Sequence, residues 1–237
     1  TTLFLLASTY DQDMHANPNN PSATNGTDAA WGGNRARPDL VKKFFPNGNV
    51  PNLESYATAE AAGDDRALFN GVNRTLDNDD VSTFKSGFGV AKFTNFKTDG
   101  TAGHDATFPD ADFFLMRAAE AYLNFAEADA RLNGGQTTAE GTNAINAIRK
   151  RANASTREDK GYSLNDICDE WSREFYFEGR RRMDLIRFNR YGGNVNYNWQ
   201  WKGGTKEGRN FSKDLNIFAI PTNELTSNKN LIQNPGY

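Results

Sequence analysis

The sequence predicts a mainly α-helical fold with long loops and a few short strands. Apolar residues recur at helical spacing through most of the second half, whereas the first half is rich in Asn, Pro, Gly and Ser and lacks a sustained period. An aromatic content of 12% argues against general disorder. The 237 residues could form one large domain or two small ones, with residues 1–107 loop-rich and residues 108–237 forming a helical scaffold.

The first half is expected to contain few regular elements. Residues 1–9 favour a strand, and the polar residues 10–34 favour a long loop. Three short elements follow: a helix over 36–46 that Pro46 stops, a helical piece near 56–62, and a strand over 88–96. A loop as long as 10–34 is usually functional or disordered, so it is a candidate binding region.

Two helices joined by a glycine turn open the second half. Asp112 is the predicted N-cap of the first, which ends at Gly134 and Gly135, residues suited to a left-handed turn. Thr137 and Glu140 form a capping-box pattern for the second. The expected apolar positions are Leu115, Ala118, Ala119, Tyr122, Ala126 and Ala130 on the first helix, and Ile145 and Ile148 on the second. The pair would form an antiparallel hairpin.

A third, longer helix is predicted from Ser163 and Asp166 to about residue 190. Its candidate buried residues are Ile167, Trp171, Phe175, Leu185 and Ile186. An aromatic, glycine-rich loop, a strand over 215–220 and a proline-started helical turn over 221–228 complete the chain.

Charge and cysteine content exclude several classes of function. The net charge is -3, from 27 Lys and Arg against 30 Asp and Glu, so no overall field attracts nucleic acid. The single cysteine, Cys168, excludes an internal disulfide framework and is expected in the core. No apolar run approaches the ~20 residues of a membrane-spanning helix. The opening residues lack the features of a signal peptide and begin as if within a domain, which suggests a fragment.

Residues 170–190 concentrate charge beside aromatic side chains. They contain four carboxylates (Glu170, Glu174, Glu178 and Asp184) and six arginines (Arg173, Arg180, Arg181, Arg182, Arg187 and Arg190), an excess too small for a phosphate-binding surface. Glu174 and Glu178 could be the acid and base of a glycosidase, but on one helix they would share a convex face without a cleft. We favour a structural network in which Glu174, Glu178, Arg181 and Asp184 take part, with Arg173 and Arg182 also offsetting the carboxylates.

The same residues resemble a family motif. Glu170, Arg173, Glu174, Glu178, Gly179, Arg181, Asp184, Leu185 and Arg187 fit the pattern E..RE...EG.R..DL.R of the SusD-like (RagB/SusD) family. The similarity extends upstream to FFLMRAAEAYLNFAEA and downstream to FAIPTNEL and NLIQNPGY. It covers at least residues 108–237, and the WQWKGG loop suggests the starch-binding branch.

The resemblance implies a fold and a function. Members are outer-membrane surface lipoproteins of Bacteroidota, in which tetratricopeptide-like helix pairs support loops that bind glycans. They do not cleave the ligand, and they cover a TonB-dependent, SusC-like transporter. The present chain resembles the C-terminal half of such a protein, so we expect the missing N-terminal half as a partner and lipid anchoring through it.

The long first loop carries the predicted glycan-binding residues. Sugar rings stack on aromatic rings, and their hydroxyls need donors and acceptors such as side-chain amides. The loop contains Tyr10, His15, Trp31, Asn34 and Arg35, and the resemblance implies an aromatic platform in roughly this region. Trp31 and Tyr10 are therefore the leading candidates.

The sequence contains two further candidate sites, each with an alternative interpretation. Tyr197, Trp199 and Trp201 alternate as in a strand and could form a second sugar platform, although core packing is the favoured interpretation. Asp110 and Asp112 could hold calcium, although capping by Asp112 alone is favoured. No cofactor is otherwise required. The function expected is capture of starch or maltooligosaccharides without catalysis, and the alternative is a helical-repeat protein-interaction module without glycan binding.

Overall fold

The computed structural model describes the chain except for residues 1–24, 28–30, 46–47, 51–57, 159 and 195. The predicted strand over 1–9 and most of the loop over 10–34 lie outside the described residues. The chain divides into two compact units, Thr1–Gly179 and Arg180–Tyr237. In neither unit does a described helix have the length and apolar character needed to cross a membrane.

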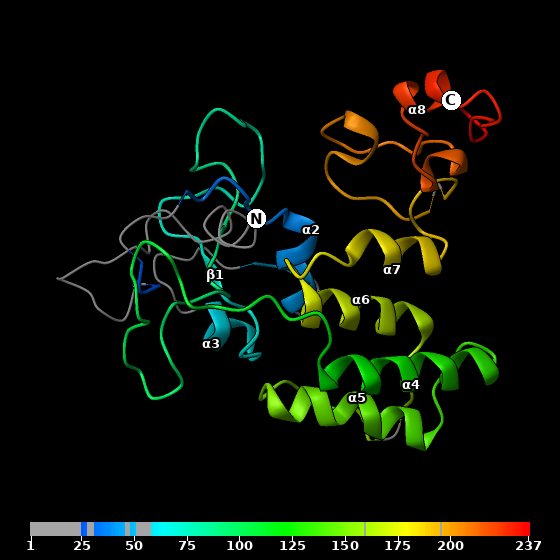
Figure 1. Ribbon diagram of the computed structural model, residues 1–237. Coiled ribbons are helices and arrows are strands. Elements are labelled where there is room, and N and C mark those ends of the chain that lie inside the picture. The colour runs from blue at the N-terminus through cyan, green and yellow to red at the C-terminus, as the bar shows by residue number, and fades with distance from the viewer. Residues whose placement is uncertain (1–24, 28–30, 46–47, 51–57, 159, 195) are drawn as a thin grey trace. The chain divides into compact units, whose positions relative to one another are not determined.

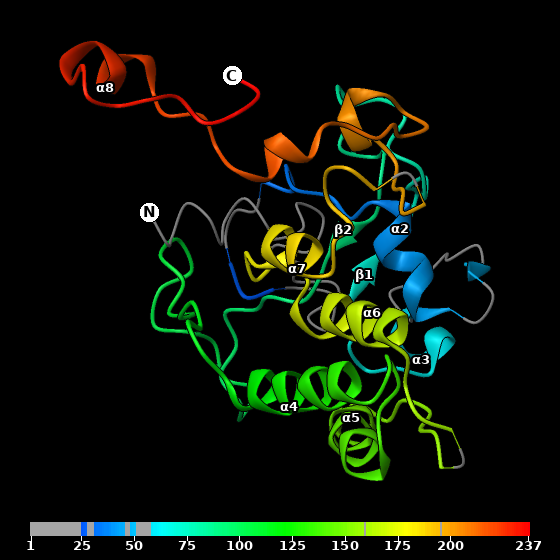
Figure 2. The same cartoon turned by 90° about the vertical axis from the view of Figure 1, so that its right-hand side faces the viewer.

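Three helices form the scaffold of the first unit: α4 (Ala118–Leu132), α5 (Ala139–Arg151) and α6 (Leu164–Phe175). Figures 1 and 2 show α4 lying between α5 and α6, and α4 packs against both. The inward face of α4 consists of Ala119, Leu123, Ala126 and Ala130, whose small side chains allow close packing. Ile145 and Ile148 of α5 and Ile167, Cys168, Trp171 and Phe175 of α6 complete this core. The mainly helical prediction is confirmed.

A side chain of α4 accepts a hydrogen bond from the backbone at the start of α5, after the turn that joins the two helices. Gly134 and Gly135 both adopt positive φ, as the sequence predicted. The capping box predicted for Thr137 and Glu140 was wrong: Thr138 occupies the N-cap, and its side chain makes no cap bond to the helix. Asp129 of α4 takes over this role, since its Oδ2 accepts a 2.7 Å bond from the Thr138 amide.

Helix α4 begins five residues later than predicted. Its N-cap is Arg117 in extended conformation, so Asp112 does not cap it. Phe114, Leu115 and Met116 precede the helix and are exposed. Leu115 and Tyr122, expected on the buried face, are 86% and 47% exposed. The buried position that the prediction missed is Leu123.

Helix α6 begins as predicted and ends much earlier. Ser163 and Asp166 form a complete capping box, with each side chain bonded to the backbone of the other. The helix stops at Phe175 because Tyr176 is extended and both Phe177 and Gly179 adopt positive φ. The continuous helix to residue 190 was therefore wrong.

The remainder of the first unit is built from short elements around an aromatic core. These are α2 (Pro38–Val41), η3 (Lys42–Phe44), α3 (Thr58–Ala62), and strands β1 (Phe69–Asn70) and β2 (Gly89–Val90). The strands pair antiparallel, with Phe69 opposite Val90. The Phe44 ring makes edge contacts with Phe69 and Tyr176 at centroid distances of 5.6 and 5.9 Å. The helical pieces at 36–46 and 56–62 are confirmed, and the strand predicted over 88–96 is shortened to two residues.

The second unit contains short helices connected by long loops. Its elements are α7 (Arg181–Arg187), η5 (Lys202–Gly204), η6 (Lys213–Asn216) and α8 (Thr222–Ser227). Leu185 of α7 is buried, and Ile186 is half-buried. The strand predicted over 215–220 is not formed, because residues 213–216 make a 3₁₀ turn that Ser212 caps. The helical turn after Pro221 is confirmed as α8.

Candidate functional site

Glu170 lies at the centre of a buried group of arginines. Its side chain is fully buried, and one carboxylate oxygen lies 2.7 Å from Arg66. The other oxygen lies 2.7 Å from both Arg149 and Arg173. These arginines come from the segment before β1, from α5 and from α6, so one carboxylate ties three parts of the first unit together.

A second group surrounds Glu174 and Glu178. Arg117 reaches both carboxylates, at 2.5 Å from Glu174 and 2.7 Å from Glu178. Arg66 and Arg151 add bonds of 3.0 and 2.7 Å to Glu174. Lys92 lies 2.5 Å from Glu178. The two carboxylates therefore converge on shared cations, contrary to the expectation that they share a convex helix face.

The cations that pair with Glu174 and Glu178 differ from those predicted. Arg173 pairs with Glu170, Arg181 donates to the Tyr197 hydroxyl at 2.7 Å, and Arg182 donates to the Asn216 carbonyl at 2.8 Å. Asp184, also buried, pairs with Arg180 and Arg187 within the second unit. The actual partners are Arg66, Lys92, Arg117 and Arg151, which lie 23 to 108 residues from Glu174 or Glu178 along the chain. No local spacing could have revealed pairs so distant in sequence.

Electrostatics oppose a role as catalytic acid for Glu170 and Glu174. Burial raises the pKa of Glu170, but the charges of Arg173, Arg66 and Arg149 outweigh it and lower the pKa to about 2. The pKa of Glu174 is also lowered, because bonds from Arg151 and Arg117 outweigh burial. A glycosidase acid needs a raised pKa in order to carry a proton at neutral pH. Glu174 thus has the properties of a structural anion.

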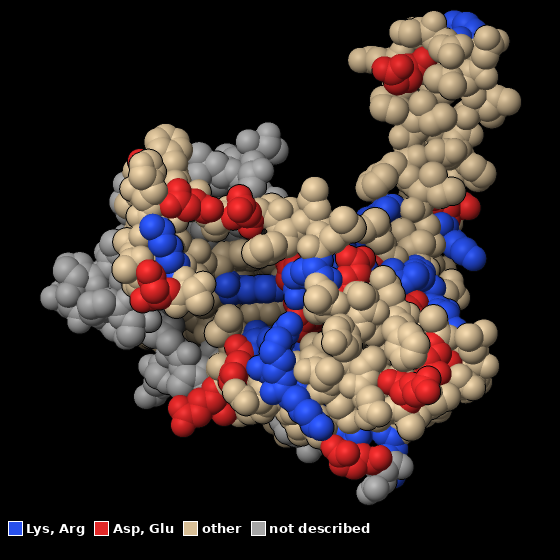
Figure 3. All heavy atoms as spheres, turned by 60° about the horizontal axis from the view of Figure 1, so that its bottom comes forward, with Lys and Arg blue, Asp and Glu red and all other residues tan. Residues whose placement is uncertain are grey.

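Two pockets border these charged groups. One, of about 350 Å³, has an apolar rim of Leu68, Phe93 and Phe114 and a charged wall that includes Arg117 and Glu178. On the face that Figure 3 presents, Lys and Arg side chains gather near the centre. Arg117 and Glu178 in this wall are paired with each other at 2.7 Å.

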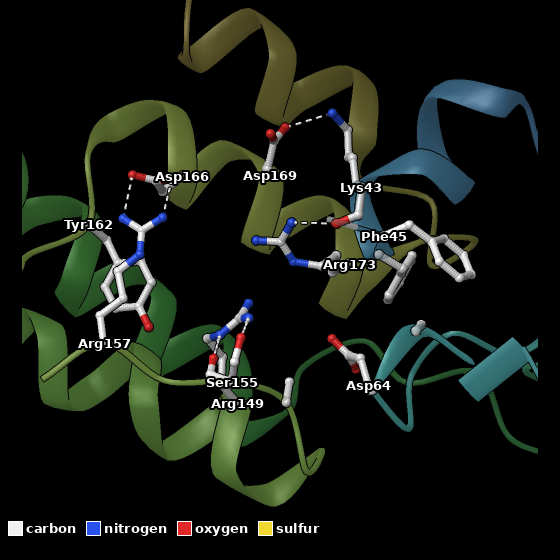
Figure 4. Close-up of a pocket in the computed structure, with 14 residues that line it drawn as sticks. Lys43, Phe45, Asp64, Arg149, Ser155, Arg157, Tyr162, Asp166, Asp169 and Arg173 are labelled. Carbon is white, nitrogen blue, oxygen red and sulfur yellow. Dashed lines mark hydrogen bonds and ion pairs between the residues drawn. The ribbon is translucent and has the colours of Figure 1, made fainter. Parts of the chain in front are cut away.

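The other pocket, of about 270 Å³, is lined by η3, α5, α6 and the segment before α6 (Figure 4). Arg157 forms two bonds to Asp166, of 2.8 and 2.9 Å, and its guanidinium lies 4.6 Å from the Tyr162 ring centroid. Lys43 pairs with Asp169 at 2.7 Å. The lining residues Arg149 and Arg173 pair with the buried Glu170. We therefore interpret this pocket as part of the scaffold.

The predicted glycan-binding loop is described only in part. Tyr10 and His15 lie outside the described residues. Trp31 is 50% exposed, and Asn34 is exposed three residues later. The segment is attached to the core through Ala36, which is buried and whose amide donates a 2.8 Å bond to the Phe88 carbonyl. A large, half-exposed aromatic ring thus lies next to a fixed anchor.

Arg35 is directed toward a neighbouring loop. Its guanidinium donates to the carbonyls of Thr83 and Val81 and lies 5.8 Å from the Phe84 ring centroid. Burial and the charge of Arg74 lower the pKa of Arg35. The side chain predicted to contact sugar therefore holds backbone carbonyls.

The second aromatic group packs around a lysine of its own chain. Lys202 is buried, donates to the Asn194 carbonyl at 2.9 Å, and lies 4.8 Å from the Trp199 ring centroid. Trp199 stacks on Tyr191 at 6.1 Å. Trp201 has a φ of 68°, so the alternation expected of a strand is absent there. These contacts agree with the core-packing interpretation of this loop.

The predicted calcium ligands are both exposed. One Asp110 oxygen accepts a 2.6 Å bond from the His104 amide, and the Asp110 amide donates to Asn95. Among the described residues, no group of three or more His, Cys, Asp or Glu side chains is arranged to hold a metal ion. Calcium at Asp110 and Asp112 stays a prediction that this geometry does not favour.

Comparison of sequences connects this chain to a known family. The sequence model of the SusD family matches residues 56–237. The starch-binding protein SusD of Bacteroides thetaiotaomicron is 38% identical over 243 residues, which cover 90% of this chain and 43% of that protein. The chain thus spans less than half the length of this curated relative.

Solved structures share the fold. A SusD-like protein from Bacteroides fragilis matches with a TM-score of 0.59 and 20% identity, over 97% of this chain and 50% of that chain. A SusD superfamily protein from Parabacteroides distasonis matches with a TM-score of 0.52 and 20% identity, over 77% and 41%. At these identities the matches establish the fold alone.

Proposed function

This chain belongs to the SusD family, and on that basis we propose that it is a non-catalytic glycan-binding protein with starch or maltooligosaccharides as its ligand. The observation that carries the proposal is the half-exposed Trp31 ring, held beside an anchored segment in a chain 38% identical to a starch-binding protein. An exposed indole ring offers an apolar face on which a sugar ring can stack.

The proposal includes a cellular role. The protein would capture glycan at the cell surface and pass it to a SusC-like, TonB-dependent transporter in the outer membrane. Family membership supports this assignment, as does the lowered pKa of Glu174, which disfavours hydrolysis by the pair proposed from the sequence. Lipid anchoring at the cell surface is part of the same proposal.

Isothermal titration with maltoheptaose tests the glycan assignment. The wild-type chain should bind, and Trp31→Ala should weaken binding at least tenfold, because one central aromatic contact is often worth more than 1.4 kcal/mol. Phe125→Ala is the matched control, since Phe125 is 49% exposed on α4, a different element of the same unit. Equal affinity in Trp31→Ala and wild type would remove Trp31 from the site. Release of reducing ends from starch would contradict the non-catalytic assignment.

One observation favours a second candidate, a helical protein-interaction module. The outward side of α4 exposes Tyr122, Phe125 and Leu132 at helical spacing. A helix pair that leaves such a stripe uncovered resembles a repeat whose neighbour is absent, and another amphipathic helix would fit it. Gel retardation by amylopectin separates the two candidates. Retardation supports glycan binding, and unchanged migration together with weak maltoheptaose affinity would support the interaction module.

A further inference from the structure

The loop over residues 75–87 is closed and internally bonded. Its ends meet where the Thr75 amide donates to the Lys85 carbonyl at 3.0 Å and the Gly87 amide donates to the Thr75 carbonyl at 3.1 Å. Within it, the Asp80 amide donates to the Ser86 hydroxyl at 2.8 Å. Gly87 is required there, because its φ is +96° and a Cβ would lie 1.9 Å from the Asn78 amide nitrogen. The loop therefore has a defined shape.

Two arginines hold this loop by its carbonyl groups. Arg35 donates to the carbonyls of Val81 and Thr83, and Arg74 donates to that of Phe84. The side chains on the same stretch remain accessible: Val81 is 78% exposed and Phe84 is 45% exposed. The arginines thus fix the backbone while leaving an aromatic ring at the surface.

The loop is linked to the segment of Trp31 through Arg35. Four residues separate Trp31 from Arg35, so their Cα atoms are at most about 14 Å apart even in a fully extended chain. Arg35 in turn contacts the Phe84 ring, and the next residue, Ala36, is bonded to Phe88 at the end of the loop. Trp31 and Phe84 are consequently within the span of one oligosaccharide.

Charge near the loop is balanced. Asp77, Asp79 and Asp80 on the loop are matched by Lys85, Arg35 and Arg74. A surface with no excess of either sign does not select an anionic or cationic glycan. It suits an uncharged glycan, held by ring stacking and hydroxyl hydrogen bonds.

We propose that Phe84 is a second sugar-stacking residue for an uncharged oligosaccharide, and that Arg35 is a positioning residue that fixes the Phe84 loop. This rests on the proposed glycan-binding function and extends it from one stacking ring to two. Trp31 and Phe84 would bind different sugar units of the same chain. Affinity should therefore increase with oligosaccharide length until both rings are reached.

Titration with maltotriose and maltoheptaose tests this arrangement. Phe84→Ala should weaken maltoheptaose binding about tenfold and leave maltotriose binding on Trp31 nearly unchanged. Trp31→Ala should weaken binding of both sugars, and Phe125→Ala should change neither. Phe84→Leu keeps an apolar side chain without a ring and should behave like Phe84→Ala. Circular dichroism checks that each variant is folded.

A double-mutant cycle tests the role of Arg35. If Arg35 acts through the Phe84 loop, Arg35→Gln should weaken maltoheptaose binding in wild type and have almost no further effect in Phe84→Ala. Independent, additive losses would mean that Arg35 contacts sugar directly and would overturn the positioning role. Unchanged maltoheptaose affinity in both Phe84 variants would overturn the second stacking residue, while a loss in Trp31→Ala would leave the proposed function standing. Unchanged affinity in Trp31→Ala would remove Trp31 from the site, and failure of the wild-type chain to bind maltoheptaose would contradict the proposed function itself.

Discussion

At the scale of single residues, Glu170 shows how this chain uses its arginines. The Glu170 carboxylate is buried and accepts bonds from Arg66, Arg149 and Arg173. A charge in such a place is tolerated only when partners replace its hydration. The sequence indicated a structural network around residues 170–184, but it could not identify partners from segments as distant as Arg66.

Replacing this carboxylate should leave buried cations without compensation. We expect Glu170→Gln to lower the free energy of unfolding by about 3–5 kcal/mol, because removal of one partner from a buried ion group strands the others. Urea titration followed by tryptophan fluorescence measures the change. Glu140→Gln, at an exposed position in the first turn of α5, should change stability by less than about 1 kcal/mol. Similar small losses in both variants would contradict the structural role of Glu170.

The same charges predict a dependence of stability on acid. The pKa of Glu170 is about 2 in the folded chain, where arginine charges outweigh burial, and about 4.3 is usual for an unfolded Glu. A lowered folded pKa stabilises the protein fully above the unfolded pKa, and this contribution is lost as pH falls from about 4.3 toward 2. Glu174, whose pKa is also lowered, changes stability in the same direction.

Unfolding midpoints in urea at pH 7, 4 and 3 should therefore decrease steeply only at the acid end. Glu170→Gln should show a shallower decrease, since it lacks one of the groups that take up a proton. An equal decrease in the variant and in wild type would show that protonation of Glu170 does not cause the acid sensitivity.

At the scale of secondary structure, local signals identified some helix boundaries and missed others. The Ser163 and Asp166 box was identified because all its atoms lie within four residues. The end of α6 at Phe175 depends on positive φ at Phe177, a conformation that its side chain gives no reason to expect. The start of α4 was predicted too early because FFLM has helical character but is exposed in the structure.

Two substitutions at Ser163 separate the contribution of its side-chain hydrogen bond from the backbone preference of the N-cap position. Ser163→Ala should destabilise the chain by about 1 kcal/mol, because the Asp166 amide loses its acceptor. Ser163→Gly should cost only a few tenths of a kcal/mol, since glycine is itself accepted at an N-cap. Thermal unfolding of the two variants measures the difference. Equal losses would show that side-chain packing, and not capping, determines the preference for serine.

At the scale of the whole molecule, a low hydrophobic content is combined with exposed apolar side chains. Only 37% of residues are hydrophobic, and several large apolar side chains are exposed in the described part of the chain. The fold class could be predicted because helical periodicity is a local property and the SusD-like motif is specific. The proposed glycan site could be predicted only as far as the segment of Trp31, because the loop over residues 75–87 is linked to that segment through tertiary bonds of Arg35.

The outward side of α4 exposes large apolar side chains. Phe125 and Leu132 are 49% and 86% exposed, whereas Leu123 on the inward side is fully buried. The double substitution Phe125→Lys and Leu132→Lys should change the free energy of unfolding by about 0.5 kcal/mol at most, because little apolar contact is lost. It should also reduce binding of a hydrophobic dye and any self-association measured by sedimentation.

Leu123→Lys is the matched change on the opposite side of the same helix. It places a charge in the core and should abolish cooperative unfolding or lower stability by several kcal/mol. If the outward double variant proved as damaging as Leu123→Lys, this side of α4 would have to be covered by polypeptide in solution. The stripe would then belong to the folding core, and the interaction-module candidate would lose the observation on which it depends.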